Sequence, residues 1–465
     1  MIKPKIGLEI HGYLITNEKL FCRCPTNYKI VKVNTNVCPV CTGMPGSKPM
    51  APNVEALKKA VAIASMLDCK ISEEVMMWQR KHYDWPDLPK GYQDTTSGSY
   101  SVPVGKDGEF LGIRIRQVHI EEDPARWDPE TGNVDYNRCG MPLVEIVTEP
   151  DFEKSKDVRE WLAKFLTTMS YIKTLNNDAG IKADVNVSVN ADGKQGDRVE
   201  IKNVNSTYAI ERAIDYEILR QSDELKKGNK IKRETRTFSE RDKVTISMRE
   251  KEQAEDYRFI PDPDLPVIGI STEMAEKILK SLPESPHAKV KRFVKQYKIT
   301  DYEASVLSSD IELAGFFEKL LKLGIKPKIA ATWVTVELLR VLNWNKKMLG
   351  DVAIKPEHFA DLLKMMEKKE ITELSAKNIL NKFIPASFSP KKDADKVSRI
   401  TNREEIEKFC RKIIENNKQA VSDYKNGEAK AISFLIGKVM EATNRRADNN
   451  LARQVLIELI GSTKI

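Results

Sequence analysis

Four cysteines near the amino terminus have the spacing of a metal site. They form two pairs, Cys22 with Cys24 and Cys38 with Cys41, in the segment LFCRCPTNYKIVKVNTNVCPVC. Two short loops of this kind supply four thiolates to a tetrahedral Zn²⁺ ion, and such a site has no open position at which to activate water. We therefore expect a structural zinc knuckle over residues 22–41. The spacing alone also permits an iron–sulfur cluster, a redox pair or four unligated thiols.

A second group of candidate residues is acidic and follows the period of β-strands. In the segment IGLEIHG, Glu9 and His11 fall on one face of a strand and the apolar residues fall on the other. Four further segments place polar side chains in the same way or at a strand end: Glu121, Glu122 and Asp123; Glu145 and Glu149; Asp184 and Asn186; Glu200 and Lys202. If these strands are neighbours, their carboxylates form one acidic face.

An acidic face of this kind favours a site for divalent cations. Like charges repel one another unless cations neutralise them, and Mg²⁺ binds a few carboxylates while it keeps waters and phosphate oxygens as its other ligands. Four basic residues are candidates to hold phosphates: Lys81, Arg249, Lys251 and Arg258. The sequence contains neither a P-loop nor a G-x-G-x-x-G motif. The residues alone leave open both a Mg²⁺–nucleotide site and a solvated acidic face.

The composition is that of an ordinary globular protein. The chain has 465 residues, of which 41% are hydrophobic and 31% charged, and its net charge is +8. No stretch of about 18 uncharged apolar residues predicts a membrane span, and the start MIKPKIGLEI lacks the apolar segment of a secretory signal. We expect a cytoplasmic protein without membrane contact, in which Cys69, Cys139 and Cys410 are buried thiols.

The patterning predicts an α+β fold. In residues 1–270, short strand patterns alternate with helical patterns at about 54–68, 154–176 and 205–227. They predict a mixed, largely antiparallel sheet with helices packed on it, which forms a cradle domain. The proline-rich segment FIPDPDLPVIG, residues 259–269, ends this body because prolines interrupt helices.

Two helical domains are expected after the cradle. Residues 271–390 predict a helical middle domain, and residues 391–465 predict a small helical tail domain. The tail contains sixteen Lys and Arg against eleven Asp and Glu. This excess of positive charge is typical of a surface that contacts phosphates, although a solvated helical face has the same signature.

Long, ordered motifs make the chain similar to a known family. They are IGLEIH, KLFC, NTNVCPVCTGMPGSKP, RKHYDWPDLPKGYQ, HIEEDPA, DYNRCGMPLVEIVTEPD, VEIKNVNS and SMREKEQAEDYRFIPDPDLP. These motifs resemble the GatB/GatE family, the B subunits of tRNA-dependent amidotransferases. The segment from NNKQAVSDYKNG to NNLARQVL resembles the tail domain of the same family, so the resemblance covers nearly the whole chain.

The resemblance implies a ligase that forms a carbon–nitrogen bond with glutamine as amido donor. The family converts misacylated Asp-tRNA(Asn) and Glu-tRNA(Gln) into Asn-tRNA(Asn) and Gln-tRNA(Gln). Its B subunit uses ATP and Mg²⁺ to phosphorylate the side-chain carboxylate of the esterified amino acid, and ammonia then displaces the phosphate. A separate glutaminase A subunit makes the ammonia, and a small C subunit supports the pair. The implied cofactors are therefore ATP, Mg²⁺ and structural Zn²⁺.

The matching motifs also imply roles for individual residues. The implied Mg²⁺ ligands are Glu9, His11, Glu121, Glu122, Glu149 and Glu200. The implied catalytic residues are Lys81, Glu122 and His11, and Tyr83 and Tyr92 lie in the same motif as Lys81. Arg249, Lys251 and Arg258 remain the expected contacts of the ATP phosphates. Cys22, Cys24, Cys38 and Cys41 match a zinc knuckle that some members carry and others lack, which favours a structural role.

Two features qualify the resemblance. Gly12 and Tyr13 stand where the family commonly has Val and Gln, which changes the residues beside the proposed metal strand. The proline-rich segment 259–269 leads directly into helices at residue 272, without the large insertion of the E type, so we expect the B type. The basic tail is then expected to dock tRNA through phosphate contacts and shape. The rival function is a non-catalytic zinc-containing RNA-binding subunit, which would not explain carboxylates on five strands.

Overall fold

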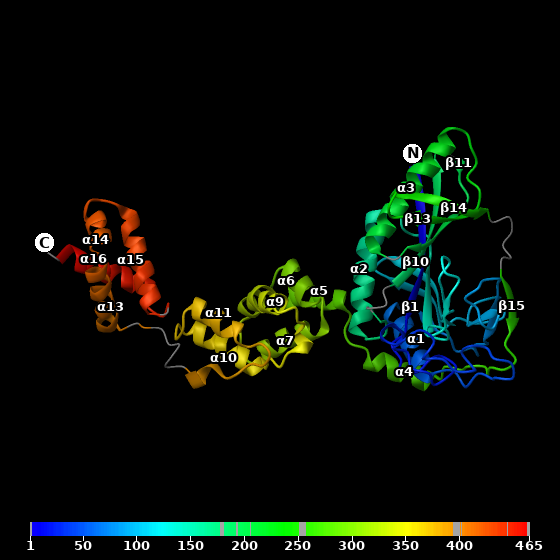
Figure 1. The fold of residues 1–465 in the computed structure, drawn as a ribbon, viewed down its shortest axis with the longest axis horizontal. Coiled ribbons are helices and arrows are strands. Elements are labelled where there is room, and N and C mark those ends of the chain that lie inside the picture. Colours follow the sequence, from blue (N-terminus) through cyan, green and yellow to red (C-terminus); the bar gives the residue numbers. More distant parts are fainter. Residues whose placement is uncertain are drawn as a thin grey trace. The chain divides into compact units, whose positions relative to one another are not determined.

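The computed structural model describes residues 2–176, 181–191, 194–204, 206–250, 257–393, 400, 402–443 and 445–462. Contacts within the chain divide it into two compact units, Met1–Pro286 and His287–Ile465. Each unit has hydrophobic core residues of its own, and we describe the units one at a time (Figure 1).

One large sheet forms the first unit. Its strands are β1 (Ile2–Tyr13), β2 (Lys70–Ile71), β3 (Gln79–His82), β4 (Tyr92–Thr95), β5 (Gly105–Phe110), β6 (Ile113–Glu122), β9 (Pro142–Thr148), β10 (Ile181–Ala191), β11 (Lys194–Gln195), β12 (Val199–Val204), β13 (Glu234–Ser239), β14 (Val244–Glu250) and β15 (Arg258–Pro261). They lie in the order β14-β13-β12-β10-β1-β9-β6-β4-β3-β15, with β2, β5 and β11 beside this path. Among the described strands β12 and β13 pair in parallel and the other pairs are antiparallel. The short strands β7 (Arg126–Trp127) and β8 (Val134–Asp135) form a separate hairpin.

Helices cover one face of this sheet and build the core with it. The covering helices are α1 (Val54–Met66), α2 (Ser155–Tyr171) and α3 (Thr207–Lys226). The Asn53 side chain caps α1 and the Ser206 side chain caps α3 by accepting hydrogen bonds from the first turn, which fixes where each helix begins. The three helices that the periodicity predicts are thus confirmed, each a few residues shorter than expected.

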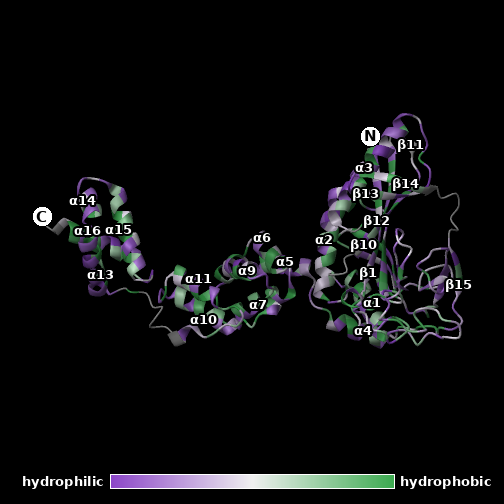
Figure 2. Ribbon diagram, viewed as in Figure 1, coloured by the Kyte–Doolittle hydropathy of each residue, from purple (hydrophilic) through white to green (hydrophobic). Residues whose placement is uncertain are grey.

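Alternation along the strands makes the second face polar. On β1, Ile6, Leu8 and Ile10 are buried in the core, so Glu9 and His11 point to the other face. Hydrophobic and hydrophilic stretches accordingly both occur along the elements of this unit (Figure 2). We call this second surface of the sheet, on which Glu9 and His11 lie, the polar face.

The end of the first unit differs from the expectation in one respect. Strand β15 lies inside the proline-rich segment and pairs with β3; Pro261, at its last position, is tolerated there because β15 is an edge strand. Helix α4 (Thr272–Ser281) then packs on the core of the first unit through Met274, Ala275 and Ile278. The three domain boundaries expected from the sequence stay predictions.

The second unit is helical. It contains α5 (Pro286–Tyr297), α6 (Asp301–Leu307), α7 (Ile311–Lys322), α8 (Pro327–Thr332), the π-helical turn η3 (Trp333–Leu338), α9 (Leu339–Trp344), α10 (Pro356–Glu367), α11 (Glu373–Asn381), α13 (Arg403–Asn416), α14 (Lys418–Lys425), α15 (Ala429–Ala442) and α16 (Asn449–Ser462). One hydrophobic cluster runs from Phe293 to Phe383 and another from Ile400 to Ile460. Within the described residues, no helix has the length and apolar character needed to cross a membrane. The α+β fold expected from the sequence is confirmed.

Candidate catalytic and metal sites

Three neighbouring strands bring a histidine and two carboxylates together on the polar face. His11 comes from β1, Glu121 from β6 and Glu145 from β9, and β9 lies between the other two strands. The Nε2 atom of His11 lies 3.6 Å from Glu145 Oε1 and 4.0 Å from Glu121 Oε2. One ligand atom from each residue lies within 4.8 Å of the others. We call these three residues the histidine–carboxylate group.

A second set of three carboxylates lies on the same face. Glu9, Asp184 and Glu200 come from β1, β10 and β12, and their ligand atoms also lie within 4.8 Å of one another. Lys202 Nζ lies 2.8 Å from an oxygen of Asp184 and 2.8 Å from an oxygen of Glu200. The amide of Asn186 donates to Glu9 Oε1 at 2.9 Å. We call Glu9, Asp184 and Glu200 the tricarboxylate group.

Lys81 supplies a positive charge at the edge of the histidine–carboxylate group. Its Nζ lies 4.0 Å from Glu121 Oε1 and 4.6 Å from the centre of the Tyr257 ring. Burial would lower the pKa of Lys81, but the negative charges of Glu121 and Glu145 outweigh it and raise that pKa. Lys81 therefore stays an ammonium ion.

The two carboxylates of the histidine–carboxylate group have different pKa values. Burial, followed by the charge of Glu121, raises the pKa of Glu145 to about 7. Burial also acts to raise the pKa of Glu121, but Lys81, His11 and a hydrogen bond from Thr95 together lower it. Two carboxylates that are buried side by side repel each other. One of the two is therefore easily protonated unless a cation binds between them.

The donor sets fit divalent cations. The tricarboxylate group offers only oxygen atoms, which suits Mg²⁺, and Lys202 pairs with Asp184 and Glu200. The histidine–carboxylate group offers two carboxylates and one imidazole. A cation there would offset the burial and the repulsion by Glu121 that raise the pKa of Glu145.

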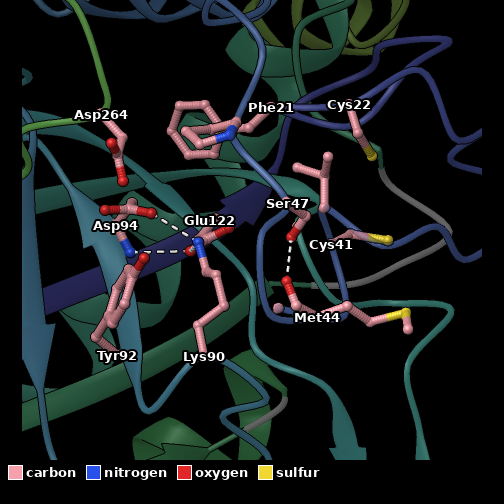
Figure 3. Close-up of a pocket in the computed structure, with 14 residues that line it drawn as sticks. Phe21, Cys22, Cys41, Met44, Ser47, Lys90, Tyr92, Asp94, Glu122 and Asp264 are labelled. Carbon is pink, nitrogen blue, oxygen red and sulfur yellow. Dashed lines mark hydrogen bonds and ion pairs between the residues drawn. The ribbon is translucent and has the colours of Figure 1, made fainter.

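Glu122 lies on the opposite side of β6 from Glu121. It accepts a hydrogen bond from the backbone N–H of Asp94 at 3.0 Å and forms an ion pair with Lys90, which also lies 2.6 Å from Asp94. These residues line a cavity of about 210 Å³ next to Cys22 and Cys41 (Figure 3). Burial, followed by the charge of Glu122, raises the pKa of Asp94 to about 8.

The four paired cysteines converge, as their spacing predicts. Their sulfur atoms all lie within 4.8 Å of one another, and Cys38 Sγ lies 3.8 Å from Cys41 Sγ. In a tetrahedral site with Zn–S bonds of about 2.3 Å, sulfur atoms are about 3.8 Å apart. Lys19 Nζ lies 3.6 Å from Cys41 Sγ, and the N–H of Cys38 donates to the same sulfur at 3.2 Å. Contacts with donors and cations favour a thiolate, as a zinc ligand requires.

The three other cysteines are buried, as expected. Cys139 donates from its thiol to the backbone oxygen of Cys41 at 3.0 Å, so it supports the four-cysteine site from outside. Cys69 and Cys410 lie within hydrophobic clusters of the first and second units respectively.

The remaining residues of the expected site lie elsewhere or are not described. Glu149 follows β9 and pairs with Arg116 at 2.7 Å, outside both acidic groups. Arg258 is exposed on the edge strand β15, opposite His82. Arg249 has a place in strand β14 through its backbone, opposite Thr235, and Lys251 lies outside the described residues.

Sequence reasoning left several residues of these sites without a role. Glu145, Asp184 and Lys202 share the expected acidic face, but only their neighbours were assigned as ligands. Lys90 and Asp94 were missed, although Lys90 stands in the same motif as Lys81. That motif holds two lysines, and alternation alone does not tell which of them faces which carboxylate.

The departure at Gly12 and Tyr13 has a structural explanation. The Tyr13 hydroxyl donates to Asp123 Oδ2 at 2.7 Å, and Arg138 pairs with the same carboxylate at 2.6 Å. A Cβ atom at position 12 would lie 3.0 Å from the side chain of Leu175. A small residue at position 12 therefore lets Leu175 pack closely beside β1.

Comparison with known proteins gives the family. Residues 4–276 match the GatB/GatE catalytic domain and residues 315–460 match the GatB domain. Three proteins named as the B subunit of aspartyl/glutamyl-tRNA(Asn/Gln) amidotransferase show the extent of the similarity. Those of Methanococcus maripaludis and Methanocaldococcus jannaschii are 44% identical to this chain, over 98% of both chains. That of Methanopyrus kandleri is 42% identical, over 99% of this chain and 100% of its own. The chain therefore belongs to the GatB/GatE family.

Proposed function

We propose that this chain is the B subunit of an amidotransferase that converts misacylated Asp-tRNA(Asn), Glu-tRNA(Gln) or both into the correctly charged forms. The names of its relatives support this substrate class. The observation that carries the proposal is the polar face. Two groups of three potential ligands lie there on neighbouring strands, with Lys81 and Lys202 beside them.

The proposed reaction has two steps. The side-chain carboxylate of the esterified amino acid attacks the terminal phosphorus of ATP, and ADP leaves. Ammonia then attacks the acyl carbon, phosphate leaves and one proton is lost, so that an amide remains. Bound Mg²⁺ would neutralise the charge of the phosphates. The residues that would hold it are Glu9, His11, Glu121, Glu145, Asp184 and Glu200.

The chain's own residues account for the rest of the chemistry. Lys81, kept as an ammonium by Glu121 and Glu145, presents a fixed positive charge to an anionic substrate group. Glu145 and Glu121 keep this positive charge beside the carboxylates that would hold the cation. Arg249, Lys251 and Arg258 remain candidates for contacts with the ATP phosphates.

The proposed cofactors and partners follow from the same reaction. Structural Zn²⁺ would occupy the four-cysteine site, which has no free ligand position for chemistry. Ammonia has to come from elsewhere, so we propose a glutaminase A subunit and a small C subunit as partners. The basic residues of the tail, 391–465, would dock the tRNA.

The test is amidation by the chain assembled with its partner subunits. The assay supplies ATP, Mg²⁺ and ammonium chloride with Asp-tRNA(Asn) or Glu-tRNA(Gln), so that glutamine hydrolysis is bypassed. Formation of Asn-tRNA or Gln-tRNA supports the proposal and gives the substrate preference. Binding of tRNA without amidation would favour the rival, a non-catalytic RNA-binding subunit with a zinc knuckle.

A further inference from the structure

Two tryptophans form an exposed aromatic pair in the first unit. The centres of the Trp85 and Trp127 rings lie 5.7 Å apart, and the rings are nearly perpendicular. Trp85 is 51% exposed and Trp127 is partly exposed. Tryptophan is usually well buried in folded proteins, so a half-exposed tryptophan is unusual. An exposed aromatic ring is able to stack with a planar ligand.

Each tryptophan directly follows a segment that supplies the polar face. Trp85 comes four residues after Lys81 and two after Tyr83, whose ring packs against Tyr257. Trp127 comes six residues after Glu121 on strand β7.

The two segments are also joined to each other. The backbone N–H of Ala125 donates to the backbone oxygen of Asp87 at 2.9 Å. Asp123, two residues before Ala125, accepts a hydrogen bond from the Tyr13 hydroxyl at 2.7 Å. Tyr13 comes two residues after His11 on β1, so both side chains lie on the polar face. The loop that carries Trp85 therefore borders the polar face.

The proposed substrate indicates which ligand would lie beside the Trp85 loop at the border of the polar face. If the proposed function holds, the reacting carboxylate belongs to an amino acid esterified to the 3′ end of a tRNA. The single-stranded 3′ nucleotides then have to lie at the entrance when the carboxylate is inside. Proteins bind single-stranded RNA by stacking its bases on aromatic rings and by contacting its phosphates with basic side chains. Arg126, exposed beside Trp127, is a suitable basic residue.

We propose that Trp85 and Trp127 form a stacking platform for the single-stranded 3′ end of the substrate tRNA. The proposal rests on the proposed function and adds a substrate-positioning site to it. Trp85 offers its exposed ring to a base, and Trp127 holds that ring by an edge-to-face contact.

The zinc knuckle has a role in this platform. Asn34 donates from its backbone to Asp135 and from its side chain to the backbone oxygen of Val134, both on β8. The backbone N–H of Asn36 donates to Asn137 at 2.8 Å. The loop between the two cysteine pairs thus holds the hairpin that carries Arg126 and Trp127. Zinc would position half of the platform without touching the substrate.

The first test measures binding of uncharged tRNA to the full-length chain assembled with its partner subunits. Intact tRNA is compared with tRNA trimmed of its single-stranded 3′ nucleotides, for wild type, Trp85→Ala, Trp85→Phe and Trp344→Ala. Trimming should weaken wild-type binding about tenfold, the effect of one stacked base. Trp85→Ala should bind intact tRNA about tenfold more weakly and lose nothing further on trimming.

The two other variants separate stacking from structure. Trp85→Phe keeps an aromatic ring and should retain the effect of trimming. Trp344 is 87% exposed in the second unit, and Trp344→Ala should retain the effect as well. An equal loss on trimming in Trp85→Ala and wild type would overturn the proposal. Weaker subunit assembly of Trp85→Ala with unchanged tRNA binding would also overturn the proposal. That result would make Trp85 and Trp127 part of an interface with a partner subunit.

The second test is kinetic. In amidation with ammonium, Trp85→Ala should raise the KM for misacylated tRNA about tenfold and leave kcat within about twofold, because stacking positions the tRNA before and during reaction alike. An unchanged KM in an active Trp85→Ala enzyme would reject the stacking platform and leave the proposed function standing. Absence of amidation in wild type would instead reject the proposed function, and the binding test would still decide on the platform.

Discussion

At the scale of single residues, Lys81 places a positive charge beside the histidine–carboxylate group. It is the cation nearest to Glu121 among the described lysines and arginines that form ion pairs, and two carboxylates keep it charged in spite of burial. We expect Lys81→Met to lower amidation with ammonium about 100-fold, since one preorganised charge contributes an effect of this size. The measurement is kcat/KM for amidation. Lys106→Met, at a lysine that is 44% exposed beside Glu74, is the control and should remain active.

The isolated cysteines give a second prediction at this scale. Burial raises the pKa of Cys69 to about 12 and that of Cys410 to about 11, and it also raises the pKa of Cys139. Because only the thiolate reacts quickly, these three thiols should resist iodoacetamide at pH 8 in the folded protein. Mass spectrometry after a timed exposure checks this. Fast labelling of Cys69 in folded protein would mean that its surroundings are more open than described.

Residue types predicted which side chains share a face of the sheet better than they predicted which side chains contact one another. Alternation on β1 was enough to place Glu9 and His11 on one face, because the period of a strand is fixed by its backbone. The division into two groups depends on which strands are neighbours, and β1 lies between β9 and β10, which are far apart from it in sequence. Glu121 and Glu122 were expected together, yet consecutive strand residues face opposite sides. Glu122 accordingly contacts Lys90 and Asp94.

At the scale of elements, hydrogen bonds join the loop between the two cysteine pairs to the β7–β8 hairpin. We predict that Cys24→Ser combined with Cys38→Ser removes the bound zinc and frees both elements. At zinc concentrations about 100 times Kd, the lost binding is equivalent to about 3 kcal/mol. Hydrogen exchange should accelerate over residues 22–41 and 126–137, while amidation persists at a higher KM for tRNA. Unchanged exchange after complete loss of zinc would contradict a structural role for the metal.

The elements themselves were predictable where local patterns decide them. Helices α1, α2 and α3 have strong periodicity, and Asn53 and Ser206 give α1 and α3 clear amino-terminal caps. Strand β15 was missed because prolines in its segment suggested only an interruption. Its pairing with β3 depends on an edge that the rest of the sheet leaves open, and no local pattern carries that information.

At the scale of the whole molecule, the two units have separate cores and are expected to have separate tasks. Residues 391–465 carry sixteen basic against eleven acidic side chains. We predict that a chain ending at residue 393 binds tRNA more weakly and with a shallower dependence on salt, since each lost phosphate contact lowers the log–log slope by about 0.7–0.9. Filter binding between about 50 and 200 mM salt measures this. An unchanged slope would place the tRNA contacts elsewhere.

The central claim is that the polar face of the sheet is the site of amidation. Its most direct test is amidation with ATP, Mg²⁺ and ammonium by His11→Ala in the assembled enzyme, since His11 joins Glu121 and Glu145. Comparison with wild type and with His358→Ala, at a histidine that contacts Ser387 in the second unit, separates the site from general effects. We predict at least about a 100-fold loss for His11→Ala alone, with normal tRNA binding. Full activity of a folded His11→Ala enzyme would contradict the account.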